Sequence, residues 1–450
     1  MDFKCLSTNY NEPLLWVRFA GKSAWQNKKP PKEKGKAMSQ KIFVGIDLAK
    51  DSSSIAAVDE EGNKTLSTFS ITNTIDGMEK LLSKLKGYEK DKILCGMEAS
   101  SNYWENIYSY LKEKGISCLL LNPYQVKKYR QALGLKIKTD SIDAESIAVL
   151  IKDRKYDNLY ISDDSVIEIK ELVRMKFCFA RRAKDLKKSV LSLLTLVFCQ
   201  YTKIIFHPFS KVSMEILSKY PTSIHMKEKS SVSKLIKIFN KYQGCHFRAD
   251  KAKELIAAAK NSFYSGKAHR SRGISISMQI EEISSLSAKI EEIENEIMLI
   301  LNPDDPNGSP SSFEILNSIK GVGIGTIAAF MGTVGNISRF SNSDKLISYI
   351  GFYPKIFESG KYKKKNPEIQ KAGPRELRYM LYLSSVAAIK HNIFFKKYYN
   401  DLVSAGMPAK KALIKVAVKI VRMMYSMIKY RTFYDPSRIF MQYHLDSLAA

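Results

Sequence analysis

The polar–apolar pattern of the first third of the chain alternates between short apolar runs and amphipathic stretches. Short runs rich in β-branched and aromatic residues predict core strands at 41–47, 55–58, 92–98 and 117–121. Stretches with helical spacing lie between or after them, at 76–85, 102–114, 124–133 and 140–151. Thr139 or Asp140 can cap the last of these helices. The pattern predicts an α/β domain over residues 41–160.

From residue 161 to residue 302 the periodicity is helical. The stretch 166–198 predicts a long basic amphipathic helix, and the insert at 207–273 is mostly helical and basic. A heptad seam follows, carried by Ile283, Leu286, Ile290, Ile293, Ile297 and Ile300. Such a seam is typical of a coiled coil or an antiparallel helical hairpin. The pattern leaves open whether it dimerises the chain or folds back on the earlier helix.

Turn-forming and charged segments divide the rest of the chain. Residues 303–310 are rich in proline, aspartate and glycine, which predicts a linker. Residues 311–432 are expected to form a mostly helical C-terminal domain, and 433–450 a tail. Residues 1–40 read as a disordered basic lead-in, because they cannot build a core. Met38 is a candidate start of translation, a hypothesis that mass spectrometry of the natural protein tests.

The net charge of the chain indicates which class of binding partner to expect. The formal net charge is +27, from 72 lysine and arginine residues against 45 acids, and it is spread along much of the chain. A field of this sign favours polyanions, with nucleic acid as the default partner. Six scattered cysteines lack zinc-site spacing and suit reduced thiols in a cytoplasmic protein. We expect no signal peptide and no membrane span.

Four acids stand where chemistry is expected. Asp47 and Glu98 end predicted strands, and Asp140 and Asp143 are three residues apart, so they share one face of a predicted helix. If the four converge, divalent cations would offset their repulsion, and two Mg²⁺ ions about 4 Å apart could clamp a phosphodiester. The plainer alternative is that these acids cap turns or suit the helix dipole.

Two C-terminal motifs suit a phosphate backbone. Glycines at the turn between two helices let backbone amides approach phosphate, as in a helix-hairpin-helix clamp, although a tight turn without a ligand is equally compatible. The motif comprises Lys320, Gly321, Gly323 and Gly325. A basic loop follows, with Lys361, Lys363, Lys364, Lys365, Lys371, Arg375 and Arg378 as candidate nucleic-acid contacts. Within it, Ser359 is either a nucleophile among cations or part of a turn.

Six segments, taken in order, resemble one family. They are Gly45–Lys50, Met97–Ala99, Lys138–Ala144, Ile319–Gly325, Ser359–Gly360 and Ile369–Arg378. They resemble the DEDD transposases of bacterial insertion sequences, which are bridge-RNA-guided, serine-assisted recombinases. The resemblance covers about residues 41–430. The middle segment and the first 37 residues are longer than is usual for the family, which leaves their contacts open.

The resemblance implies a fold and a chemistry. It implies an RNase H-like (RuvC-like) α/β N-terminal domain, a helical coiled-coil middle and a mostly α C-terminal transposase domain with a helix-hairpin-helix. Asp47, Glu98, Asp140 and Asp143 match the metal-binding tetrad, which is expected to hold Mg²⁺, as two ions. Ser359 matches the serine that links covalently to DNA. The implied partners are element-end and target DNA, a structured guide RNA and further copies of the chain, as a dimer or tetramer.

Two other functions compete with strand transfer. In a Holliday-junction-type nuclease, metal-activated water attacks the DNA and Ser359 is a bystander. In a non-catalytic nucleic-acid-binding scaffold, the acids only cap helices. Ser359→Ala separates the first alternative from a recombinase, and Asp47→Ala or Asp143→Ala tests the second.

Overall fold

The computed structural model describes residues 40–100, 102–134, 139–154, 156, 159–264, 266–302, 310–354, 358–359, 362–363 and 369–439. The chain divides into two compact units, Met1–Ile161 and Ser162–Ala450. The expected lead-in, the expected linker and the end of the tail lie almost wholly outside the described residues. None of the described helices combines the length and the apolar character needed to cross a bilayer.

The first unit is built on a five-stranded mixed sheet with the order β3-β2-β1-β4-β5. The strands are β1 (Ile42–Leu48), β2 (Ser52–Val58), β3 (Lys64–Thr72), β4 (Ile93–Glu98) and β5 (Ser117–Leu121). The first three form an antiparallel meander, whereas β4 and β5 run parallel to β1. The predicted α/β domain is therefore confirmed as a mixed sheet with helices, and β3 is a strand that was not predicted.

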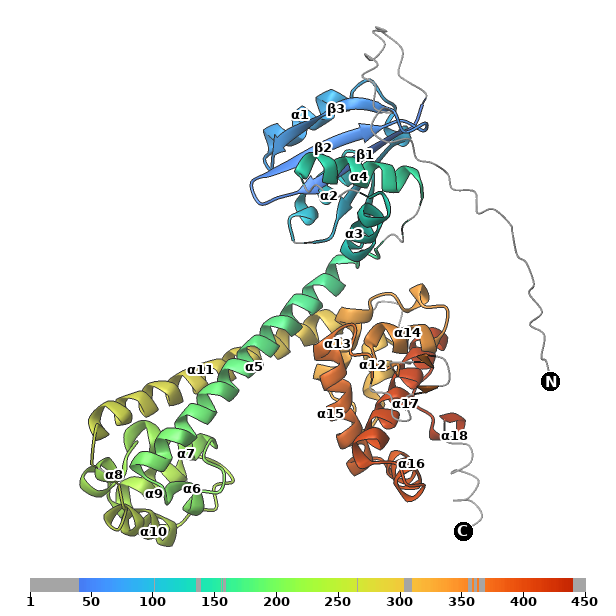
Figure 1. The fold of residues 1–450 in the computed structure, drawn as a ribbon. Helices are drawn as coiled ribbons and strands as arrows, with labels where there is room; N and C mark the ends of the chain where they lie inside the picture. Colours follow the sequence, from blue (N-terminus) through green and yellow to red (C-terminus); the bar gives the residue numbers. More distant parts are fainter. Residues whose placement is uncertain are drawn as a thin grey trace, which may run out of the picture. The chain divides into compact units, whose positions relative to one another are not determined.

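Helices cover both faces of this sheet (Figure 1). They are α1 (Ile75–Leu85), α2 (Trp104–Glu113), α3 (Pro123–Ala132) and α4 (Asp140–Lys152). On one face, the side chains of Ile42, Val44 and Ile46 pack with α1 and α2. On the other face, Phe43 packs with α3 and α4. Because side chains alternate along a strand, β1 contributes its even-numbered residues to one core and its odd-numbered residues to the other.

Local sequence fixes where these helices begin. The side chains of Thr74, Asn122 and Thr139 accept hydrogen bonds from backbone N–H groups in the first turns of α1, α3 and α4. Such caps satisfy donors that have no partner within the helix. Thr139, and not Asp140, therefore caps α4, which leaves the Asp140 side chain at the exposed start of the helix.

The second unit is organised around two long helices, α5 (Asp164–Val197) and α11 (His269–Leu301) (Figure 1). Lys176 pairs with Glu294 at 2.6 Å, and Arg182 pairs with Glu282 at 2.5 Å. The pairing order shows that the two helices run antiparallel. The heptad seam of α11 therefore packs against α5 within the chain, which is one of the two arrangements that the sequence left open. Near its end, Leu301 is buried, whereas Ile300 is only partly buried.

Each end of this helical pair has its own hydrophobic core. One core lies where the chain passes from the end of α5 to the start of α11. A small helical domain forms there from α6 (Tyr201–Ile204), α7 (Lys211–Lys219), α8 (Ser223–Lys229), α9 (Val232–Asn240) and α10 (Ala249–Lys260). At the other end, the core belongs to α12 (Ser312–Asn317), α13 (Ile324–Val334), α14 (Ser343–Ile350), α15 (Arg375–His391), α16 (Ile393–Ser404) and α17 (Ala409–Tyr430). A short helix, α18 (Pro436–Ile439), follows.

Candidate active site

Asp47 and Glu98 stand side by side at the ends of two neighbouring strands. β1 and β4 are parallel, and their register pairs Ile46 with Met97. Asp47 and Glu98 are the next residues along, so their Cα atoms are about 5 Å apart, the spacing of adjacent strands. Both side chains are partly buried. The strand pairing thus brings together two acids that are 51 positions apart in the sequence.

Both acids point to the face of the sheet that α4 covers. A Cβ atom on Gly45 would lie 2.0 Å from the backbone oxygen of Ala144, and one on Gly96 would lie 2.7 Å from the side chain of Ile151. These two glycines therefore face α4 and let it lie directly on the strand backbones. Side chains two residues along a strand share a face. Asp47 and Glu98 consequently face α4 as well.

The direction of α4 places its first turn over the same edge. Its last residue, Lys152, lies against Gly62, in the turn beside the start of β1. Its middle lies over Gly45, so its first turn extends toward the ends of β1 and β4. This turn carries Asp140, which is exposed, and Asp143, which is buried. The four predicted acids therefore share one edge and one face of the sheet.

An arginine on α3 offsets part of this negative charge. The Nε atom of Arg130 lies 2.8 Å from Oδ1 of Asp143, and both side chains are largely buried. Carboxylates gathered at one edge repel one another unless a cation compensates. Among the described residues, which include all four acids, no three Asp, Glu, His or Cys side chains are close enough to hold a metal ion. The acids are gathered at one edge but are not drawn into a ligand cluster.

Two further contacts hold α4 in place. The Tyr129 hydroxyl donates a 2.5 Å hydrogen bond to Asp153, just beyond the end of α4. Burial and this carboxylate raise the pKa of Tyr129, so the hydroxyl remains a donor. Glu145 accepts hydrogen bonds from Lys64 Nζ at 2.6 Å and from Thr68 Oγ1 at 3.0 Å. Glu145 is therefore engaged with β3, and it serves below as a control acid.

The glycine turn of the second unit contains one glycine that is packed against backbone atoms and one that is open. Gly321 has φ +99°, and a Cβ there would lie 2.5 Å from Cα of Ala388 on α15. The turn between α12 and α13 therefore requires glycine at this position in order to pack. Gly323, at the N-cap of α13, has no atom within 4 Å of a Cβ position, and Lys320 is exposed. A Cβ on Gly325 would approach Lys176 Nζ at 3.1 Å.

Ser359 lies on the first strand of a short hairpin. This strand, β6 (Glu358–Ser359), pairs antiparallel with β7 (Tyr362–Lys363), and Ser359 is opposite Tyr362. Lys361, Lys364 and Lys365 lie outside the described residues, and only the backbone of Ser359 and Lys363 is described.

The two ends of the loop that carries this hairpin are fastened together. The amide of Gln370 donates to the carbonyl of Tyr353 at 2.8 Å. Arg378 Nη1 lies within 3.2 Å of the carbonyl oxygens of Ile350, Ala372 and Gly373. Burial lowers the pKa of Arg378. This guanidinium therefore organises the loop, whereas the candidate phosphate contacts Lys371 and Arg375 are exposed.

Sequence reasoning missed three residues of the first site. Arg130 was not singled out, because one arginine on a predicted helix resembles any other basic surface residue. Gly45 and Gly96 carried a signal that could have been used, since a glycine inside a strand often marks a close approach of another backbone. Together they explain how α4 reaches the sheet.

Two family models match this chain, one in the region of the acids and one in the region of the glycine turn and Ser359. Residues 44–199 match the family model DEDD_Tnp_IS110, described as a transposase, and residues 313–400 match the model of the transposase IS116/IS110/IS902 family. The chain is 32% identical over 115 residues to the transposase for insertion sequence element IS1533 of Leptospira borgpetersenii, an alignment of 26% of this chain and 32% of that protein. The chain thus aligns with only about a third of that relative.

Two more distant relatives align over most of their length. The insertion element IS116 uncharacterized 44.8 kDa protein of Streptomyces clavuligerus is 21% identical, over 88% of this chain and 97% of its own. The pilin gene-inverting protein of Moraxella bovis is 19% identical, over 88% of this chain and 98% of its own. These similarities extend across both units.

Proposed function

The chain belongs to the IS110/IS116/IS902 family of DEDD transposases, and on this premise we propose that it cuts and rejoins DNA phosphodiesters with an acidic tetrad and a serine nucleophile. Family membership implies DNA as a partner and a divalent metal as a cofactor. The observation that carries the proposal is the seating of α4 on Gly45 and Gly96. It places the first turn of α4 over the edge at which Asp47 and Glu98 end their strands.

The donor set of this edge fits a hard divalent cation. Asp47, Glu98, Asp140 and Asp143 offer only carboxylate oxygens, the ligands that Mg²⁺ prefers, and we propose that they hold two such ions. When bound, these ions would supply positive charge that polarises the scissile phosphate. The N-terminus of α4 adds the positive end of a helix dipole at the same edge. Arg130 pairs with the Asp143 carboxylate at this edge.

In the proposed reaction, Ser359 exchanges one phosphate ester for another. The serine oxygen forms a bond to phosphorus, while the bond from phosphorus to a deoxyribose oxygen breaks. The serine proton leaves, and the released deoxyribose oxygen gains a proton. For rejoining, a deoxyribose hydroxyl of another strand attacks the same phosphorus and displaces the serine oxygen. The RNase H-like fold, guide-RNA pairing, and assembly into a dimer or tetramer belong to the same proposal.

The test is formation of a covalent protein–DNA adduct. The protein is incubated with element-end DNA, Mg²⁺ and co-purified RNA, and adducts are resolved on denaturing gels. We expect Ser359→Ala and Asp143→Asn each to abolish the adduct, because the first removes the nucleophile and the second a metal ligand. The matched controls are Ser341→Ala, an exposed serine of the same unit, and Glu145→Gln, an acid of the same helix, and both should retain it.

The same assay separates the two competing functions. DNA cutting by Ser359→Ala that still depends on Asp143 would replace the recombinase by a nuclease that uses water. Unchanged adduct formation in Asp143→Asn would remove the metal role, since Asp143 would then serve only in its ion pair with Arg130.

A further inference from the structure

We propose that the outer face of α5, together with the loop at residues 205–210, binds a single strand of DNA. The inference rests on the proposed function only in that DNA is the partner. The relevant side chains of α5 are Arg174, Arg181, Lys184 and Lys188, called the α5 ridge below. All four are exposed. The loop lies outside both family models, which match residues 44–199 and 313–400.

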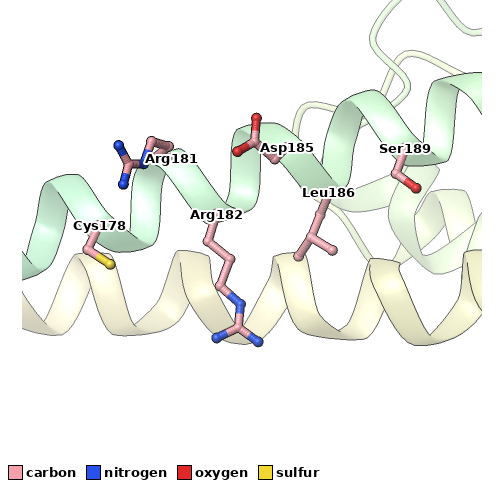
Figure 2. A pocket seen from close by; sticks show the side chains of 6 residues that line it. All are labelled: Cys178, Arg181, Arg182, Asp185, Leu186 and Ser189. Atoms are coloured by element: carbon pink, nitrogen blue, oxygen red, sulfur yellow. The ribbon is translucent and has the colours of Figure 1, made fainter.

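The α5 ridge lies on the side of the helix away from α11. Ala183 and Val190 are buried on the opposite side. Arg174, Arg181 and Lys188 follow one another at intervals of seven residues, or about 10.5 Å along the helix axis. Figure 2 shows Arg181 pointing away from α11, whereas Arg182 reaches across it. A shallow pocket that includes Cys178, Leu186 and Ser189 lies beside Arg181.

Little inside the protein competes for these cations. Glu171 pairs with Arg174 at 2.5 Å, and Asp185 pairs with Lys188 at 3.5 Å, and all four of these side chains are more than half exposed. Exposed pairs of this kind contribute little free energy, so a phosphate can replace the carboxylate. Among the residues that the structure describes, no ion pair engages Arg181 or Lys184. Arg182, by contrast, is paired with Glu282.

An exposed aromatic side chain stands in the loop at residues 205–210. Phe206 is 84% exposed, and its ring meets His207 edge-on, with the ring centroids 5.1 Å apart. In the same loop, Phe209 lies under Lys187 of α5, with the Nζ atom 5.6 Å from the ring centroid. The loop is thereby joined to the helix that carries the ridge.

Proteins that bind single strands combine rows of cations with exposed aromatic rings. The cations follow the phosphates, and a base stacks on the ring. A base pair would keep its bases stacked inside the duplex, out of reach of Phe206. Since DNA is the partner that the family implies, single-stranded DNA is the ligand that fits this surface.

Fluorescence anisotropy tests the proposal. The full-length protein is titrated without Mg²⁺ against fluorescein-labelled dT20 at several salt concentrations. Replacing Arg174, Arg181 and Lys188 together by serine should weaken binding at least about tenfold and reduce the slope of log K against log salt by about 2. Phe206→Ser should weaken binding about fivefold or more and leave that slope unchanged, because stacking involves no phosphate.

Matched controls test whether the effects come from this surface or from any loss of charge or of an exposed ring. The triple replacement of Lys234, Lys253 and Lys260 by serine removes the same charge from α9 and α10. Phe263→Ser removes another exposed phenylalanine, 92% accessible. Both controls should bind like the unmodified protein. Ridge variants that bind as well as these controls would overturn the proposal. Equal competition by a 20-base-pair duplex, or tenfold tighter binding of rU20, would overturn the assignment to single-stranded DNA.

The failure of this proposal is distinct from the failure of the catalytic one. Ser359→Ala and Asp143→Asn leave the α5 ridge intact, so both should bind dT20 with unchanged affinity. Loss of the adduct with normal dT20 binding then concerns catalysis alone. Loss of dT20 binding on changing the ridge concerns this surface alone.

Discussion

The acids of the first unit and the serine of the second are held by structures of different kinds. Asp47 and Glu98 are fixed by a parallel strand pairing, and α4 lies directly on the two glycines that precede them. Ser359 stands on a strand of two residues, in a loop whose two ends are fastened together. A strand and a helix in contact hold side chains more rigidly than a loop can.

In the proposed function, this difference would give the two regions different tasks. Metal ligands must be positioned to within a fraction of an ångström, which suits strands and a helix in direct contact. A nucleophile that must reach a phosphate and later release it suits a loop whose ends are fixed. Four substitutions test whether the two regions differ in this way, from the largest expected effect to the smallest.

Gly45→Ala should cause the largest loss. Its Cβ would lie 2.0 Å from the Ala144 oxygen and 2.5 Å from the Ala148 nitrogen, so α4 must move as a backbone unit. We expect the free energy of unfolding of the first unit to fall by about 3 kcal/mol, measured by urea denaturation. Gly87→Ala is the control, because its Cβ would meet nothing within 4 Å. Equal stability of the two variants would show that α4 does not rest on β1.

Gly373→Ala should do comparable but smaller damage to the serine loop. Gly373 has φ +100°, and a Cβ there would lie 2.2 Å from the Tyr349 oxygen. We expect a loss of about 2 kcal/mol, with faster hydrogen exchange at the Gln370 amide. Gly323→Ala, at an open position with ordinary φ, should leave both unchanged. If the exchange rate at Gln370 stays constant in Gly373→Ala, the loop is not fastened there.

Arg378→Met should loosen the same loop without straining the backbone. The methionine keeps the apolar stem and removes the hydrogen bonds to the carbonyls of Ile350, Ala372 and Gly373. We expect a loss of about 1.5 kcal/mol in thermal unfolding, with exchange at Gln370 again faster. Arg375→Met, which removes an exposed arginine one turn earlier, is the matched control. Similar losses in both variants would point to charge instead of the three carbonyls.

Thr139→Ala should have the smallest effect, because it affects only the start of α4. The Thr139 hydroxyl accepts a hydrogen bond from the amide of Ile142 at 3.3 Å. Its loss should lower the free energy of unfolding by about 1 kcal/mol, measured by urea denaturation. Thr139→Ser keeps the hydroxyl and should keep most of that stability. A larger loss than in Gly45→Ala would mean that the cap, and not the glycine contact, positions the acids.

Much of the fold could be predicted from the sequence because the relevant signals are local. Apolar periodicity indicated β1, β4 and β5 and most helices of the first unit, and Thr139 was one of two predicted caps for α4. β3 was missed because its polar and apolar residues have no clean alternation, and only one of its nine positions is buried. The heptads of α11 indicated a buried seam but not its partner.

By itself the sequence determined which residues carry charge, where strands end on acids, and which family the motifs resemble. Only the tertiary structure decided that β4 lies next to β1, that α4 points its first turn at the ends of both strands, and that Arg130 meets Asp143. The physical reason is the distance along the chain over which each kind of interaction acts. Periodicity and capping depend on neighbours within one turn or one strand, whereas pairing and seating depend on contacts between segments whose separation along the chain carries no information about distance.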